Sequence, residues 1–293
     1  MTDPGAGAQI FEQGYRRYEG PRLGPGASIR SLAIHSALRA LGLRRTVWAK
    51  LLPIATVLIA YVPAAIFVGV AALIPDTITR NVDVIPKYAD YFGSISAAIL
   101  LFVAIVGPEV LCSDRKNGML GMYLASPLTR ETYLLAKVLA VLPVLGLVTI
   151  GPQLLLLIGR TLVDAGPDGP GAFALLLARA VVGGIVVSAL YTAISLAAAS
   201  LTDRRAVASA GVILLLLVSS GVTSALVENA KTSHRLYLLN LFLLPFELVQ
   251  RVYGERGNEP TITTAALAFA FVAWVAGAAA VVVWRYRKLT VAR

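Results

Sequence analysis

Residues 51–74 read LLPIATVLIAYVPAAIFVGVAALI and hold no charged side chain. A helix rises about 1.5 Å per residue, so this run is long enough to cross a bilayer core of about 30 Å. Five more apolar runs of similar length follow, at residues 93–112, 133–159, 173–201, 206–227 and 263–284. The fold class that this pattern predicts is an all-α membrane protein, a polytopic bundle of six transmembrane helices.

The composition agrees with a membrane protein. Of the 293 residues, 57% are hydrophobic and 14% are charged, whereas a soluble domain carries about 25% charged residues. The formal net charge is +10, but the Lys and Arg side chains stand beside the ends of the apolar runs. A nucleic-acid surface would gather them on one face with stacking aromatics, so no nucleic acid is expected as a partner. Cys112 is the only cysteine, so no internal disulfide can form.

The distribution of basic residues predicts the orientation. Residues 1–50, 113–137, 204–205 and 285–293 together hold 18 of the 26 Lys and Arg residues, and all of them lie on one side of the predicted spans. Basic residues are enriched on the cytosolic side of membrane proteins. Both termini are therefore expected in the cytosol, and the chain is expected in the cell (inner or plasma) membrane as a multi-pass protein in contact with membrane lipids.

Four regions follow from this layout. Residues 1–27 are rich in Gly, Pro and Arg and are expected to form a flexible cytosolic tail. Residues 28–50 are expected to form an interfacial amphipathic helix, because Ile29 to Trp48 carries a narrow polar stripe among aliphatic residues. Residues 51–284 make the six-span membrane domain, and residues 285–293 a basic cytosolic tail.

The segment before the last span has an unusual apolar stretch, Leu236–Val249. It is at most fourteen residues long and is interrupted by Pro245 and Glu247. It is too short to cross the membrane and too apolar for an open loop. A re-entrant extracellular hairpin fits best, while a helix lying flat on the outer membrane surface stays open on the same length argument.

Motifs for catalysis are absent from the sequence. No Gly-x-x-x-x-Gly-Lys-[Ser/Thr] string occurs, so the chain is not expected to hydrolyse ATP itself. No His-Glu-x-x-His or Gly-x-Ser-x-Gly motif occurs either, and the two histidines are predicted on opposite sides of the membrane. The chain is therefore expected not to be an enzyme, with no catalytic residue and no metal site.

The connection between the second and third predicted spans is the most informative segment. It runs from Gly107 to Arg130 and contains a short apolar helix, Met119–Ala125, between charged residues and Pro127. An apolar helix at this place is exposed to water unless a partner covers it. Thr129 is expected to cap the third span, and Glu131 in its first turn suits the helix dipole.

This segment resembles the same connection in the permeases of type 2 ATP-binding cassette (ABC) exporters. There an acid closes the second span, a basic pair and a Gly follow, and a leucine-containing stretch ends in Ser-Pro-x-[Ser/Thr]-Arg. The matching residues are Glu109, Arg115, Lys116, Gly118, Leu120, Leu124, Ser126, Pro127, Thr129 and Arg130, with Lys137 at the family's usual Lys one turn into the next span. The chain departs from the pattern at Met119, where Thr commonly follows the Gly.

The resemblance implies a permease that works as a dimer, with a second copy or a paralogue, on two copies of a cytosolic ABC ATPase subunit. ATP and Mg are expected on that subunit, and no cofactor is expected on this chain. Each permease rests its short cytosolic helix in a groove of the ATPase, where a rigid apolar helix can transmit motion. The expected coupling residues are Met119, Leu120, Met122, Tyr123 and Leu124.

Two further groups of residues are expected to have a role. Glu109 near the membrane boundary needs a partner, so a hinge salt bridge with Arg115 is predicted, with a base of the interfacial helix as the other possible partner. In the resembled family the second and fifth spans line the substrate route. The fifth span here is rich in small and hydroxylated residues, which favour close helix packing or a substrate path: Ser219, Ser220, Thr223 and Ser224.

The function expected from the sequence is the permease subunit of an ABC transporter, exporting a hydrophobic or amphipathic substrate. An ion-gradient-driven secondary transporter is the alternative, although its usual internal repeat and buried charges are not evident. A polytopic membrane enzyme is a weaker alternative because it would need a reactive cluster. Of these three functions, only that of an ABC permease requires a separate ATPase.

Overall fold

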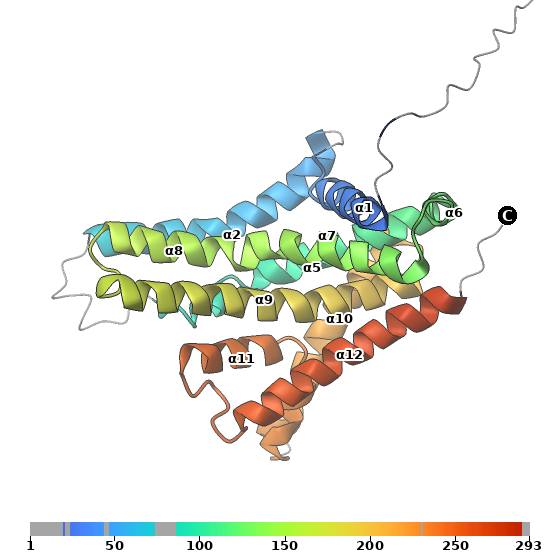
Figure 1. Ribbon diagram of the computed structural model, residues 1–293. Coiled ribbons are helices and arrows are strands. Elements are labelled where there is room, and N and C mark those ends of the chain that lie inside the picture. The colour runs from blue at the N-terminus through green and yellow to red at the C-terminus, as the bar shows by residue number, and fades with distance from the viewer. Residues whose placement is uncertain (1–19, 21–23, 44–46, 74–85, 230, 289–293) are drawn as a thin grey trace, which may run out of the picture.

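The computed structural model describes residues 20, 24–43, 47–73, 86–229 and 231–288 (Figure 1). Residues 1–19 and 21–23 of the predicted 1–27 tail, and residues 289–293 of the predicted C-terminal tail, lie outside the described residues. In the described part the chain is helical, with no strand. The elements are α1 (Pro25–Ala40), α2 (Val47–Leu73), α4 (Tyr91–Ser94), α5 (Ser96–Lys116), α6 (Leu120–Leu124), α7 (Arg130–Thr149), α8 (Gly151–Leu162), α9 (Gly169–Leu201), α10 (Arg205–Ser224), the π-helix η1 (Ala225–Asn229), the 3-10 helix η2 (His234–Leu239), α11 (Leu244–Tyr253) and α12 (Thr264–Lys288).

Six helical segments are long and apolar enough to cross a membrane, which confirms the predicted number. They are Lys50–Leu73, Ser96–Lys116, Arg130–Leu162, Gly169–Leu201, Arg205–Asn229 and Thr264–Lys288. Each overlaps one of the predicted runs and differs from it by a few residues at most ends. The all-α, six-span architecture is therefore shown.

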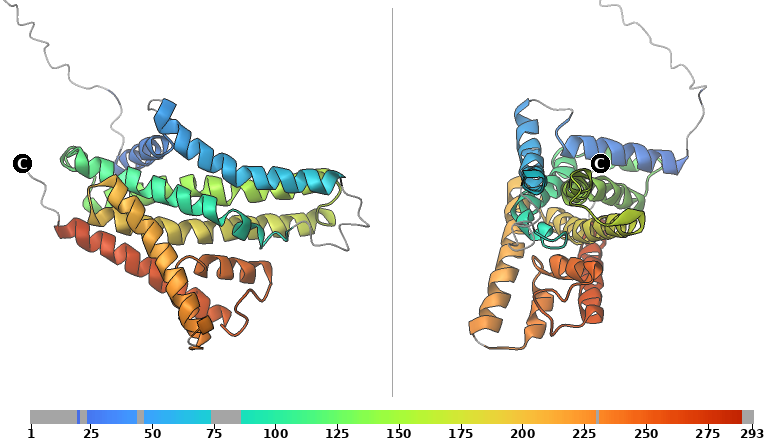
Figure 2. Two further views of the ribbon diagram at one scale, coloured as in Figure 1. Left: turned by 180° about the vertical axis from the view of Figure 1, so that it is seen from behind. Right: turned by 90° about the vertical axis from the view of Figure 1, so that its left-hand side faces the viewer.

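The bundle is built around α5, which is the most buried of the six spans. It packs against α2, α7, α9 and α10, while α12 lies against α9. Figure 1 shows α7 and α8 end to end, side by side with α9, with α2 along α8, and Figure 2 shows α10 running at a steep angle to them. The helices α1 and α6 and the last turn of α12 share one end of the bundle, here called the α6 end (Figure 1).

Close packing of α5 against α9 depends on Gly107. A Cβ atom there would lie 1.7 Å from the Ser195 hydroxyl oxygen, so only glycine fits. The same hydroxyl donates a hydrogen bond to the carbonyl of Val103, 3.1 Å away. Small residues that let helix backbones approach are a common device in membrane bundles, because lipid supplies no hydrophobic force between helices.

The third span is broken at Ile150, between α7 and α8. Pro152 stands in the first turn of α8 and has no N–H to continue the hydrogen-bond ladder of α7. The two helices still form one apolar segment, Arg130–Leu162. The sequence predicted a single uninterrupted run here, and the proline explains the difference.

The first helix is shorter than predicted. The sequence suggested one helix from Ile29 to Trp48, whereas α1 ends at Ala40. Gly42 adopts a left-handed conformation with φ 71°, and the Leu43 N–H donates to the Leu38 carbonyl at 3.0 Å. This arrangement is a glycine C-cap, which stops the helix and turns the chain towards α2. That α1 lies in the membrane interface stays a prediction.

The apolar stretch Leu236–Val249 forms two short helices. It comprises most of η2 and the first part of α11, joined by a turn at Asn240. The Asn240 side-chain oxygen accepts hydrogen bonds from the N–H groups of Phe242 (3.2 Å) and Leu243 (2.9 Å). The segment packs on α9 and α12, and it is not one of the six helical segments long enough to cross a membrane. Its re-entry into the membrane stays a prediction.

Candidate functional site

The short helix α6 protrudes at the α6 end of the bundle between α5 and α7 (Figure 1). Gly118 adopts φ 64° and turns the chain out of α5, a conformation that favours glycine. At the other end Thr129 caps α7, since its hydroxyl accepts from the Thr132 N–H and the Thr132 hydroxyl accepts from the Thr129 N–H. The predicted cap and the acidic residue Glu131 in the first turn are confirmed.

The side chains of the five predicted coupling residues differ in how far they are exposed. Leu120 and Tyr123 pack partly against the core, and Met119 and Leu124 are half-buried. Met122 is 71% exposed and points away from the bundle. One face of α6 therefore rests on the bundle, while Met122 is the coupling residue that offers an apolar side chain outward.

Beneath α6 lies a cluster of buried charges. The Asp114 carboxylate is fully buried at the end of α5. One oxygen lies 2.5 Å from Nη2 of Arg39 on α1, and the other lies 2.6 Å from Nζ of Lys137 on α7. The Tyr133 hydroxyl donates to the second oxygen at 3.0 Å, and Lys137 also donates to the Ser36 hydroxyl at 2.8 Å. One carboxylate thus joins three helices.

Aromatic rings complete the cluster. The Lys137 ammonium lies 5.5 Å from the ring centroid of Tyr123 on α6 and 5.1 Å from that of Tyr133. Tyr133 in turn packs against Tyr123 at 5.7 Å and against Tyr286 of α12 at 5.8 Å. A cation over a ring face is stabilised by the ring quadrupole. Helix α6 is thereby in contact with the charged cluster, and so is the end of α12.

The electrostatics match the geometry at the two residues that lie outside the spans. Burial works to lower the pKa of the Arg39 guanidinium, but the Asp114 charge and hydrogen bond outweigh it and the pKa lies above its ordinary value. Burial, and then the Asp114 charge, raise the pKa of the Tyr123 hydroxyl. Arg39 is therefore held charged and Tyr123 neutral.

The structure corrects the predicted pairing of Glu109 with Arg115. Glu109 pairs with Arg205 at the start of α10. Arg115 points instead towards the end of α9, where it contacts the carboxylate of Asp203 at 2.9 Å and donates to the carbonyl of Ser200 at 2.6 Å. Glu109 and Arg115 are about 1.7 turns apart on α5, so they face different neighbours. A hinge role for either residue stays a prediction.

The hydroxyl groups of the fifth span mostly bind backbone. Ser219 accepts from the N–H of Leu241 at 3.2 Å, and Ser220 accepts from the side chain of Asn240 at 3.4 Å. Thr223 donates to carbonyls of its own helix. Ser224 lines a small pocket near η2. The first two hold α10 against the turn after η2, and a role along a substrate path stays a prediction.

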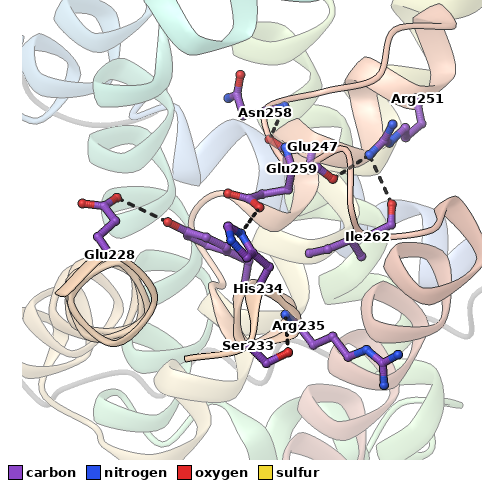
Figure 3. A network of polar contacts seen from close by, with 10 residues as sticks. Glu228, Ser233, His234, Arg235, Glu247, Arg251, Asn258, Glu259 and Ile262 are labelled. Carbon is purple, nitrogen blue, oxygen red and sulfur yellow. Dashed lines mark hydrogen bonds and ion pairs between the residues drawn. The ribbon is translucent and has the colours of Figure 1, made fainter. Parts of the chain in front are cut away.

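A second polar network joins η2, α11 and the loop before α12 (Figure 3), and α11 lies away from α6 (Figure 1). Glu247 of α11 is 7% exposed and accepts hydrogen bonds from the N–H groups of Asn258 (3.1 Å) and Glu259 (3.4 Å). The Glu259 carboxylate lies 2.9 Å from Nδ1 of His234. Burial raises the pKa of Glu247 above its ordinary value. These contacts tie η2, α11 and the loop before α12 together.

Asp114 and Arg39 were missed as site residues by reasoning from the sequence. Arg39 lies in the segment predicted as an interfacial helix, and Asp114 lies in the connection Gly107–Arg130, but neither was singled out. The available signal was Lys137, a charge inside an apolar run that requires an acidic partner. Among the residues that the structure describes, no three His, Cys, Asp or Glu side chains gather as a metal site would require.

Comparison with known proteins gives one match. The family model described as ABC-2 family transporter protein matches residues 73–282, which is over two thirds of the chain. The matched region starts at the end of α2 and includes α6, Asp114 and Lys137. No curated protein matches the sequence.

Proposed function

The chain belongs to the ABC-2 family of transporter proteins, as the permease component in the membrane. From this premise we propose that it exports a hydrophobic or amphipathic substrate. A separate ATPase, which docks on α6, drives the export. Proteins of this family normally work with a separate ATP-binding subunit. The observation that carries the docking proposal is the placement of α6, exposed on one side and resting on the buried charge cluster on the other.

The cluster offers a route for motion. A force on α6 acts on Tyr123, whose ring contacts Tyr133 and the Lys137 ammonium. Lys137 and Arg39 are both held by Asp114, so α7, α1 and α5 cannot slide past one another without separating buried opposite charges. Separating such a pair costs about 3–5 kcal/mol. Movement of α6 is therefore passed on as rigid movement of three helices.

The cytosolic side is proposed to be the α6 end. Basic residues gather there, as expected for the side that faces the cytosol. Among the described ones are Arg39, Arg115, Lys116, Arg130, Arg204, Arg205, Arg285, Arg287 and Lys288. A soluble ATPase can reach α6 only if this end is cytosolic, so the orientation and the docking proposal support each other.

A dimer of permeases, with two ATPase subunits, is the assembly that we propose. Helix α10 packs on α5 with one side and exposes an aliphatic face on the other, which includes Leu214, Leu217 and Val218. A second copy or lipid would cover this face in the membrane. The exposed face carries no charged residue between Arg205 and Glu228, which suits an apolar cargo passing along it.

An ion-gradient-driven transporter is the competing proposal. Such proteins usually place paired or unpaired ionisable residues near the middle of the membrane. The buried Asp114–Lys137 pair is the one feature here that favours it. That pair lies at the end of the spans, next to α6, where it serves a docking helix better than an ion path.

The test is purification of the native complex in mild detergent through a tag on this chain, followed by reconstitution into vesicles. The proposal expects a P-loop ATPase in equal amount with the chain, and substrate movement that requires ATP. Substrate movement by the chain alone under an ion gradient, with no ATPase present, would refute it in favour of the secondary transporter.

A further inference from the structure

A long apolar groove lies between α9, α10 and α12, with a volume of about 790 Å³. Gly211 and Gly277 line it, and no atom lies within 4 Å of the place where a Cβ would stand on either residue. Its rim residues Leu201, Val207 and Leu215 are exposed, so the groove opens sideways from the bundle. In a bilayer that opening faces hydrocarbon, and an apolar cavity of this size is not filled by water.

The groove, together with the turn of α12 that follows its last lining residue Val281, is about as long as one leaflet. Trp274 is the groove residue of α12 that lies farthest from Arg285, and its indole N–H donates to the Leu238 carbonyl of η2 at 3.1 Å. Arg285 lies eleven residues further along α12, a rise of about 16 Å. Half of a hydrocarbon core of about 30 Å is about the same length. An occupant that runs from Arg285 to Trp274 would therefore span one leaflet.

The open end of the groove carries basic residues. Arg285 follows the groove residue Val281 by one turn of α12, and Arg204 precedes the groove residue Ala208 by one turn at the start of α10. Lys288 lies 4.1 Å from the ring centroid of Trp284 beside them. Within the described part of the chain, none of these three bases has an acidic partner at ion-pair distance.

Neighbouring charges at this end are already paired. Arg205 contacts Glu109, and Asp203 contacts Arg115. The positive charge left at the open end of the groove belongs to Arg204, Arg285 and Lys288.

A second apolar groove provides an internal comparison. It lies between α7, α9 and α12 and has a volume of about 540 Å³. Its basic residue, Arg287, pairs with Glu131 at 3.0 Å. The two grooves have similar apolar walls, but the charge at the mouth of the second is neutralised within the protein.

We propose that the groove between α9, α10 and α12 binds one anionic phospholipid, with an acyl chain reaching Trp274 and the phosphate beside Arg204 and Arg285. Guanidinium groups bind phosphate with charge-assisted hydrogen bonds, and aliphatic walls suit a hydrocarbon chain. This lipid site goes beyond the transport function. The site lies in the cytosolic leaflet if the α6 end is cytosolic, and only this placement rests on the proposed orientation. Two bases near an anionic lipid give a preference of about 25-fold over a zwitterionic lipid, which is about 2 kcal/mol.

The test uses Trp274 as the reporter. The chain has three tryptophans, so Trp48→Phe with Trp284→Phe leaves Trp274 alone. The full-length protein is placed in nanodiscs of phosphatidylcholine that contain increasing fractions of phosphatidylglycerol or phosphatidylcholine with brominated acyl chains. Bromine quenches tryptophan fluorescence on contact. Brominated phosphatidylglycerol should quench Trp274 at about 25-fold lower fraction than brominated phosphatidylcholine.

Three variants make the result specific. Arg204→Gln with Arg285→Gln should remove the preference, while Arg287→Gln, at the mouth of the paired groove, should leave it. Gly211→Leu should reduce quenching by both lipids because its side chain fills the groove. The proposal is overturned if both lipids quench equally, if the preference survives the double substitution, or if neither lipid quenches Trp274, since another occupant such as cargo or a second copy would then fill the groove. Because no ATP-driven step is measured, this outcome is separate from that of the transporter proposal.

Discussion

Asp114 Oδ2 and Lys137 Nζ lie 2.6 Å apart, and both side chains are completely buried. Removing Asp114 leaves the buried Lys137 ammonium without its acid, which costs about 3–5 kcal/mol, whereas removing Lys137 leaves Asp114 paired with Arg39. Asp114→Asn should therefore lower the thermal unfolding midpoint of the purified protein strongly, and Lys137→Met should lower it less. The double variant should lose clearly less than the sum of the two, as measured by fluorescence-detected size exclusion after heating. Additive losses would mean that the two residues do not act as a pair.

Arg39 should hold α1 to the bundle, because its guanidinium contacts both the Asp114 carboxylate and the carbonyl of Val110. Charged hydrogen bonds of this kind contribute about 1.5–3 kcal/mol each. In Arg39→Gln, the amides of α1 should exchange with deuterium more than tenfold faster. Arg30→Gln is the matched control, since Arg30 is exposed on the same helix. Equal exchange in the two variants would rule out this role for Arg39.

Glu247 should make the segment between α10 and α12 sensitive to pH. Burial raises its pKa, so the folded state holds the proton more tightly than the unfolded state does. Its contribution to stability is present at low pH and is lost as the pH rises from the ordinary value through the raised one. The groups facing Glu247 are Arg251, Asn258 and Glu259.

Hydrogen exchange of residues 231–262 measures this effect. Protection should be greater at acidic pH than at neutral pH, and Glu247→Gln should remove most of that difference. A difference that persists unchanged in Glu247→Gln would assign the pH response to His234 and Glu259 instead.

Thiol labelling should report the orientation through Met122 rather than through Cys112. Cys112 is fully buried, so it should resist impermeant thiol reagents from either side until the protein is denatured. In a Cys112→Ala background, Met122→Cys should react in inverted vesicles and not in intact cells. Leu162→Cys, 78% exposed at the other end of the bundle, should do the reverse. The opposite pattern would invert the proposed topology.

Sequence periodicity and run length predicted the six spans because burial in lipid requires long apolar helices, whatever their neighbours. The cap at Thr129 was also predictable, because capping depends only on residues that are close in the sequence. Which side chains form ion pairs between helices was not predictable. Glu109 was assigned to Arg115, its neighbour in sequence, whereas the fold brings Arg205 of another helix to it.

The central cluster was missed for a related reason. Asp114, Arg39 and Lys137 lie on three helices, and only packing brings them together. The break at Ile150 and the early end of α1 at Ala40 depend on single residues, Pro152 and Gly42, within otherwise continuous patterns. Such local features are visible in the sequence, but their effect depends on how the neighbouring helices pack.

Co-purification of the ATPase with Met122→Asp tests the docking role of α6 most directly. Met122 is exposed, so the change should not disturb the bundle, but it places a charge in an apolar contact at a cost of several kcal/mol. The amount of ATPase bound to the tagged chain should fall at least tenfold, while Leu162→Asp, an exposed apolar residue at the opposite end, should bind it normally. If Met122→Asp retains the ATPase and ATP-driven efflux at the level of the unmodified protein, α6 is not the docking helix.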